Sequence, residues 1–345
     1  MNNTVSLDSV LDMTIQANKV SVDTSMFMAN KPRFGLSSVR LREGYTGHPS
    51  LEQWAVAADL HWDVVSCQEQ FTNKGVLYNT PDIVLVRGDN NTKLGTVSNS
   101  YRKVTPKDVL NFFSDLIEKY DFEILEAGYA DAGRKIYVYA KSGVEWEVAN
   151  GDRTLNNLLF MTSLDGSSST VIQPFVESFY CMNQLPMAGR LFSPIKVNHS
   201  SVFNPAKVKL DLGIYGEATN KFADSLKAMA KKTVNNHEAL SILYNLLKAK
   251  EDIREESTIN INKVVSLHDK FRGAGIAATE EGRKGTLWGV LNAVTEYTDH
   301  DMGRNDNTRW KSKTCGAGAT LKAKAYQYIN EICNEQVEIE LIKLP

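Results

Sequence analysis

The sequence predicts an α+β fold: an antiparallel sheet with helices on one face, followed by a helical C-terminal third. Two observations support this class. Short β-rich runs separated by turn residues recur from residue 62 to residue 176, and amphipathic helical periodicity replaces them after Pro205. The composition, 42% apolar and 23% charged, is typical of a globular protein and not of a disordered or fibrous chain.

The first 45 residues are rich in Asn, Ser, Thr and Met and predict a partly extended N-terminal arm. A short helix is expected at 50–60, where Leu51, Trp54 and Ala58 recur at helical spacing. β-rich runs then predict strands at 63–70, 83–87 and 93–98.

The clearest helix signal of the first half covers residues 106–120. Thr105 can cap this helix, Pro106 suits its first position, and Asp108 lies in its first turn. Further strands are expected at 122–127, 135–140, 158–164 and 170–176. The last two would form a pair joined by a turn at 165–168, in which Gly166 permits a positive φ.

Beyond Pro205, helices are expected at 222–231, 238–248, 285–297 and 321–333. Residues 337–341 alternate between apolar and acidic side chains, which predicts a final edge strand. The chain therefore divides into an arm (1–45), an α+β core (46–204), a helical insertion or subdomain (205–280), and C-terminal helices and an edge strand (281–345) that complete the core.

Charge and motif content exclude several classes of function. The formal net charge of -2 means that any nucleic-acid site must be a local basic patch. Four widely spaced cysteines argue against a zinc knuckle or a disulfide framework, and no apolar run is long enough to span a membrane, so a cytosolic protein is expected. The sequence contains no GxxxxGK[ST], HExxH or GxSxG motif. We therefore expect no cofactor and no catalytic residue.

The strongest candidate for binding is the segment 302–325, which carries six cations against one acid. We expect a basic loop in which these cations neutralise phosphates, Trp310 stacks on a base, and the glycine-flanked helix start at 316–320 attracts anions. The cations are Arg304, Arg309, Lys311, Lys313, Lys322 and Lys324. The alternative is a solvated loop whose cations neutralise acids elsewhere.

A row of polar side chains precedes this segment. Asn292, Glu296 and His300 follow one another at four-residue spacing, and Asp299 lies beside them. Together with Asp301 they could hold a divalent cation. The alternative is a helix end whose Asn292 and Glu296 anchor the following loop. The lone His199 is more often structural than catalytic.

Four segments resemble the phage/plasmid-like protein family of unknown function: TSLDGSSS at 162–169, YCMNQL at 180–185, His199, and WGVLNAVTEYTDH at 288–300. The family pattern comprises a C-x-N-x-L step, a downstream histidine and an N-A-x-T-E-Y-x-D-H helix, and the similarity spans about 94–331. The resemblance implies a product of a bacteriophage, plasmid or prophage that acts in the cytoplasm of a bacterial host.

From these observations we expect a non-enzymatic DNA-binding protein, which binds or anneals single-stranded DNA during recombination or replication, as a homo-oligomer. The alternative is a protein-binding factor that inhibits or redirects a host defence or replication protein. A third hypothesis is a metal-dependent nuclease centred on Glu296, Asp299 and His300.

Overall fold

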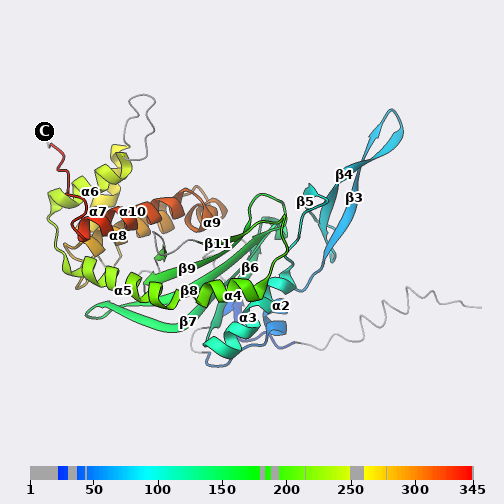
Figure 1. Ribbon diagram of the computed structural model, residues 1–345, viewed down its shortest axis with the longest axis horizontal. Coiled ribbons are helices and arrows are strands. Elements are labelled where there is room, and N and C mark those ends of the chain that lie inside the picture. Colours follow the sequence, from blue (N-terminus) through cyan, green and yellow to red (C-terminus); the bar gives the residue numbers. More distant parts are fainter. Residues whose placement is uncertain are drawn as a thin grey trace, which may run out of the picture.

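The computed structural model describes residues 22–29, 37–42, 45–178, 183–187, 194–213, 215–248, 260–276 and 278–343. Within these residues the main sheet is antiparallel, in the order β1-β2-β6-β7-β8-β9-β10, and β11 pairs with a different part of β9 (Figure 1). The strands are β1 (Phe27–Ala29), β2 (Ser37–Leu41), β6 (Glu123–Ala130), β7 (Lys135–Ala149), β8 (Asp152–Ser163), β9 (Thr170–Ser178), β10 (Gln184–Pro186) and β11 (Ile195–Val197). The first two strands belong to the expected arm.

A second sheet consists of β3 (Val64–Asn73), β4 (Val76–Arg87) and β5 (Lys93–Ser98). The β3–β4 hairpin projects from the body of the molecule (Figure 1). Arg87 anchors its base, because this buried guanidinium pairs with Asp59 at 3.0 Å and Asp89 at 2.7 Å and lies over the Trp62 ring. The long hairpin replaces the two short strands expected at 63–70 and 83–87.

One face of the main sheet packs against α2 (Leu51–Ala57) and α3 (Pro106–Tyr120). The α3 helix has the predicted bounds, and Thr105 forms a capping box with Asp108. Its Phe112 contacts Phe160 of β8, with ring centroids 4.9 Å apart. Because side chains alternate along a strand, Ile136 and Val138 of β7 join this core while Tyr137 and Tyr139 face the other side of the sheet.

The helices of the C-terminal part are α4 (Pro205–Gly213), α5 (Tyr215–Lys231), α6 (Asn236–Lys248), α7 (Ile261–Asp269), α8 (Leu287–Glu296), α9 (Asp306–Cys315) and α10 (Ala317–Cys333). Two π turns, η2 (Lys270–Ala274) and η3 (Tyr297–Asp301), follow α7 and α8, and a 3₁₀ turn, η1 (Asp131–Gly133), lies in the sheet region between β6 and β7. Helices α5–α8 and α10 share one core that reaches the ends of β7 and β9. The fully buried Arg283–Asp152 ion pair, at 2.7 Å, joins this core to the sheet.

The α+β class and the helical C-terminal third are confirmed, but two local expectations are wrong. Residues 337–341 form no strand. Within this range the Glu340 carbonyl instead accepts a hydrogen bond from the side-chain amide of Asn245 on α6, at 2.7 Å. The expected basic loop at 302–313 is largely the helix α9, which Asn305 caps through a capping box with Thr308. Among the described helices, none combines the length and apolarity that a membrane crossing requires.

Candidate nucleic-acid interface

Trp310 cannot stack on a base as we expected, because its side chain lies in the hydrophobic core. The residue is 1% exposed, and its ring lies 5.4 Å from the Tyr137 ring, centroid to centroid. It thereby seats α9 on the face of the main sheet opposite α3. Helical sequence periodicity did not reveal this contact, because most of the residues around Trp310 in α9 are polar.

Two of the expected phosphate-binding lysines are also buried. The Lys322 ammonium is fully buried and pairs with the Asp299 carboxylate at 2.6 Å, and burial lowers its pKa against the opposing effect of Asp299. Lys313 is 9% exposed, and burial lowers its pKa as well. Neither lysine can meet a phosphate in this conformation, so these two expectations are wrong.

The other cations of the segment remain at or near the surface. Arg304 and Lys324 are exposed, and Arg309 is partly buried. Lys311 pairs with Asp131 of η1 at 2.6 Å, with 41% of its side chain exposed. This pair places the cations of α9 beside the turn that joins β6 to β7.

The polar row at the end of α8 has a different protein partner for each member. Glu296 accepts hydrogen bonds from Lys270 Nζ and the Ile276 amide, both at 2.8 Å. Asp299 accepts from the Gln184 amide at 2.7 Å as well as from Lys322. Asn292 donates to the carbonyl of Trp288, one turn earlier, at 2.9 Å. His300 Nε2 lies 3.1 Å from Asn183 Oδ1.

These contacts favour the structural interpretation of the row over the metal site. Glu296 anchors the loop after η2, as the alternative hypothesis states, whereas the Asn292 bond stays within its own helix. Within the described residues, no group of three or more His, Cys, Asp or Glu side chains is placed to hold a metal ion.

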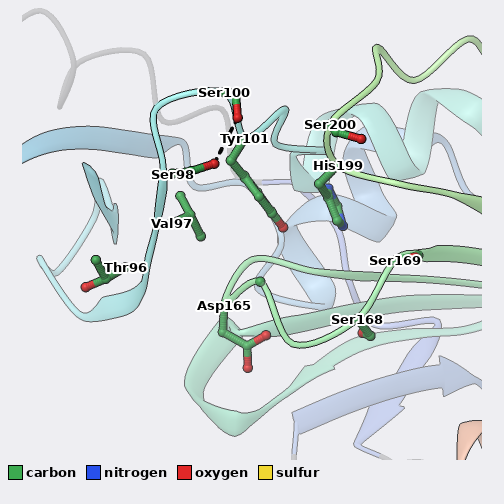
Figure 2. Close-up of a pocket in the computed structure, with 11 residues that line it drawn as sticks. Thr96, Val97, Ser98, Ser100, Tyr101, Asp165, Ser168, Ser169, His199 and Ser200 are labelled. Carbon is green, nitrogen blue, oxygen red and sulfur yellow. Dashed lines mark hydrogen bonds between the residues drawn. The ribbon is translucent and has the colours of Figure 1, made fainter. Parts of the chain in front are cut away.

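A cavity lies elsewhere in the described structure, where the β3–β5 sheet meets the main sheet (Figure 2). Its volume is about 520 Å³, and hydroxyl-bearing side chains dominate its lining. The lining residues are Thr96, Val97, Ser98, Ser100, Tyr101, Asp165, Gly166, Ser168, Ser169, His199 and Ser200. We call this cavity the hydroxyl pocket.

Three segments that are far apart in the sequence build the hydroxyl pocket. The Tyr101 and His199 rings stack with centroids 4.4 Å apart, and both extend toward the turn that carries Asp165 (Figure 2). The Tyr101 hydroxyl donates to the Ser163 carbonyl at 2.6 Å and so fixes its ring over that turn. Gly95 permits the close approach of the turn, because a Cβ at this position would lie 2.6 Å from Asp165 Cα.

His199 has one nitrogen that is bonded and one that is not. Nδ1 lies 2.8 Å from the Arg102 carbonyl, which can only accept, so Nδ1 carries the proton. His199 is 9% exposed, and its Nε2 atom is buried without a hydrogen-bond partner within the described residues. A buried polar atom without a partner is costly unless a ligand or water satisfies it.

Asp165 gives the pocket an ionised carboxylate. Burial alone would raise its pKa, but hydrogen bonds from the Ser163 hydroxyl and from Ser167, together with the nearby Lys135 ammonium, lower the pKa below its usual value. The hydrogen bonds from Ser163 and the Ser167 amide both end on Oδ1. Oδ2 is therefore the oxygen with lone pairs for a ligand.

Exposed arginines lie beside the pocket and connect it to α9. The Arg102 amide donates to the His199 carbonyl at 2.6 Å, and the Arg134 carbonyl accepts from the Leu164 amide at 2.7 Å. Neither guanidinium has an ion-pair partner in the described part of the chain. Arg134 directly follows η1, whose Asp131 binds Lys311, so η1 links the surroundings of the pocket to the cations of α9. We call this surface the basic strip; its members are Arg102, Arg134, Arg304, Arg309 and Lys311.

Sequence reasoning missed most of the pocket. Residues 162–169 and His199 carry part of the family resemblance, but patterns along the chain identify the first only as a turn and the second only as a lone histidine. The two other segments that resemble the family, 180–185 and 288–300, also meet: Asn183 contacts His300, and Gln184 contacts Asp299. Residues 180–182 lie outside the described residues.

Comparison with known proteins identifies a family and nothing more specific. No curated protein and no solved structure matches the chain. Residues 93–318 match the family model described as Domain of unknown function (DUF932), a range that includes both the hydroxyl pocket and the polar row. The chain therefore belongs to the DUF932 family, which confirms that its family is uncharacterised.

Proposed function

We propose that this protein is a non-enzymatic single-stranded DNA-binding protein of a bacteriophage or mobile element, which acts in recombination or replication in the cytoplasm of a bacterial host. The supporting observation is the basic strip, whose Arg102 and Arg134 guanidinium groups are exposed beside the hydroxyl pocket and have no ion-pair partner among the described residues. Arginine side chains, backbone amides and hydroxyls are the groups that bind phosphates in proteins that contact nucleic acids.

A single strand fits this surface better than a duplex. The strip passes from the pocket around η1 to α9, and the pocket beside it is concave and lined by side chains that can hydrogen-bond to unpaired base edges. Single strands expose such edges, and proteins hold them through a positively charged path along the backbone combined with contacts to the bases. The loss of Trp310, Lys313 and Lys322 from the interface moves the proposed contacts toward the pocket but leaves the class of ligand unchanged.

The test is fluorescence anisotropy with labelled single-stranded and duplex oligonucleotides over a salt series. The wild type should prefer the single strand, and its affinity should fall as salt rises. The Arg102→Gln/Arg134→Gln double variant should bind more weakly, and the slope of log K against log salt should fall by about 1.4, since each lost phosphate contact removes about 0.7 for a single strand.

The matched control is the Lys248→Gln/Lys343→Gln double variant, which loses the same charge from exposed positions on α6 and in the C-terminal segment. This control should keep the wild-type affinity and slope. Equal slopes for the two double variants would remove Arg102 and Arg134 from the interface. No binding of any oligonucleotide at low salt would refute DNA binding itself.

A protein-binding factor directed at a host defence or replication protein is the second candidate, and the β3–β4 hairpin favours it. Phe71 near the tip is 52% exposed and stacks on Tyr78, and Val76 and Leu77 beside them are also exposed. Apolar groups gathered on a projecting hairpin are typical of protein contacts. The same surface would serve assembly of the chain into a homo-oligomer.

A further inference from the structure

We propose that the hydroxyl pocket accepts one unpaired nucleobase that carries an exocyclic amino group, while the neighbouring arginines hold the flanking phosphates. This inference rests on the proposed function and assigns a subsite to it.

The pocket has the dimensions and walls of a small-ligand site. At about 520 Å³ it lies within the range of roughly 300–1,000 Å³ that is usual for such sites. The stacked Tyr101 and His199 rings provide an aromatic wall, and unpaired bases in protein complexes commonly lie against such rings. The ring positions are fixed by the Tyr101–Ser163 and His199–Arg102 hydrogen bonds, so the wall exists before a ligand arrives.

The fixed polar atoms of the pocket are acceptors. With the Nδ1 proton donated to the Arg102 carbonyl, the lone pair of His199 is at Nε2, and this buried atom has no partner among the described residues. Asp165 presents Oδ2 and stays ionised, because its Oδ1 is stabilised by Ser163 and Ser167. Two acceptors select a ligand that offers N–H donors, and the serine hydroxyls can rotate to serve its remaining acceptors.

The charge of the lining residues disfavours a phosphate in the interior of the pocket. No lysine or arginine is among these residues, the nearby Lys135 ammonium already donates to the Ser167 hydroxyl, and the Asp165 carboxylate would repel a phosphate. Arg102 and Arg134 lie at neighbouring positions, where they can neutralise the phosphates on either side of an inserted base. Guanine, adenine and cytosine each carry an amino group with two N–H donors, whereas thymine offers a single ring N–H between two carbonyl oxygens that would oppose the acceptors.

The experiment measures binding of a dodecamer of thymidine and of the same dodecamer with one central guanine, adenine or cytosine. One amino base should tighten binding by about tenfold, the effect of a well-placed base contact. Asp165→Asn is the informative variant, because its Oδ1 can keep the bonds to Ser163 and Ser167 while an amide donor replaces Oδ2. This variant should lose the preference for the amino base to within about twofold, as one such contact is removed.

Two further proteins complete the experiment. Asp224→Asn changes the same charge at an exposed position on α5 and should keep the preference. His199→Phe retains an aromatic ring beside Tyr101, removes the Nε2 acceptor, and should weaken the preference even if Asp165→Asn fails to fold. Binding without base discrimination in the wild type, or discrimination that survives in both pocket variants, would overturn the base subsite and leave DNA binding standing. No binding of any dodecamer at low salt would overturn both proposals.

Discussion

Replacing Lys322 by Met should destabilise the protein by about 3 kcal/mol, because the substitution leaves the Asp299 carboxylate buried without its cation. Breaking a buried ion pair by removing one partner typically costs about 3–5 kcal/mol. We expect the lower end of this range. The Gln184 amide still donates to Asp299, and the buried Lys313 ammonium also acts on Asp299 electrostatically.

Urea unfolding followed by far-UV circular dichroism measures this cost. The control is Lys232→Met, which breaks a surface pair with Glu335, a residue whose side chain is 84% exposed, and should cost less than about 1 kcal/mol. The Lys322→Met/Asp299→Asn double variant should be more stable than Lys322→Met. The side-chain oxygen of the introduced asparagine can still accept from the backbone N–H of Gln184, and no uncompensated charge remains.

Equal losses of unfolding free energy in Lys322→Met and Lys232→Met would contradict this prediction, since burial would then add nothing to the pair. The two roles considered for Lys322 are also separable by DNA binding. A stable Lys322→Met protein with a reduced salt slope would restore the phosphate contact that the sequence suggested, whereas a destabilised protein with the wild-type slope supports the structural role.

Three further predictions concern the pocket and the hairpin. The folded-state pKa of Asp165 lies below its usual value of 3.8. Its ionisation therefore stabilises the fold above pH 3.8, and this contribution is lost as the pH falls through the folded value. In urea unfolding, the free energies of the wild type and Asp165→Asn should converge in that pH range. Gly95→Ala should displace the Asp165 turn. Anisotropy should then show weaker single-stranded DNA binding with little change in the salt slope. An unchanged affinity would show that the turn can move away without loss of binding. The free energy of unfolding of Phe71→Ser/Leu77→Ser should stay within about 1 kcal/mol of the wild type, since both side chains are exposed. Sedimentation should show reduced self-association of this variant. An unchanged sedimentation profile would exclude the hairpin from assembly.

Elements with strong local signals follow from the amino-acid sequence alone. The α3 helix has its predicted bounds because Thr105, Pro106 and Asp108 specify its start and an apolar stripe specifies its buried face. Alternation and turn residues also predicted the consecutive strands β6, β7, β8 and β9 of the main sheet, although β7 and β8 extend beyond the expected ranges. The strands β1, β2, β10 and β11 of the same sheet were not predicted. The acidic alternation at 337–341 misled, because alternation cannot show whether a neighbouring strand is available.

Only the tertiary structure decided which charges are available to a ligand. A count along the chain treats Lys322 and Arg304 alike, yet the packing of α10 buries one beside Asp299 and leaves the other in solvent. The hydroxyl pocket was equally inaccessible to sequence reasoning, because Tyr101, Asp165 and His199 are separated by many residues and meet only where the two sheets join. Local patterns specify the elements, whereas burial and the meeting of distant segments depend on how those elements pack.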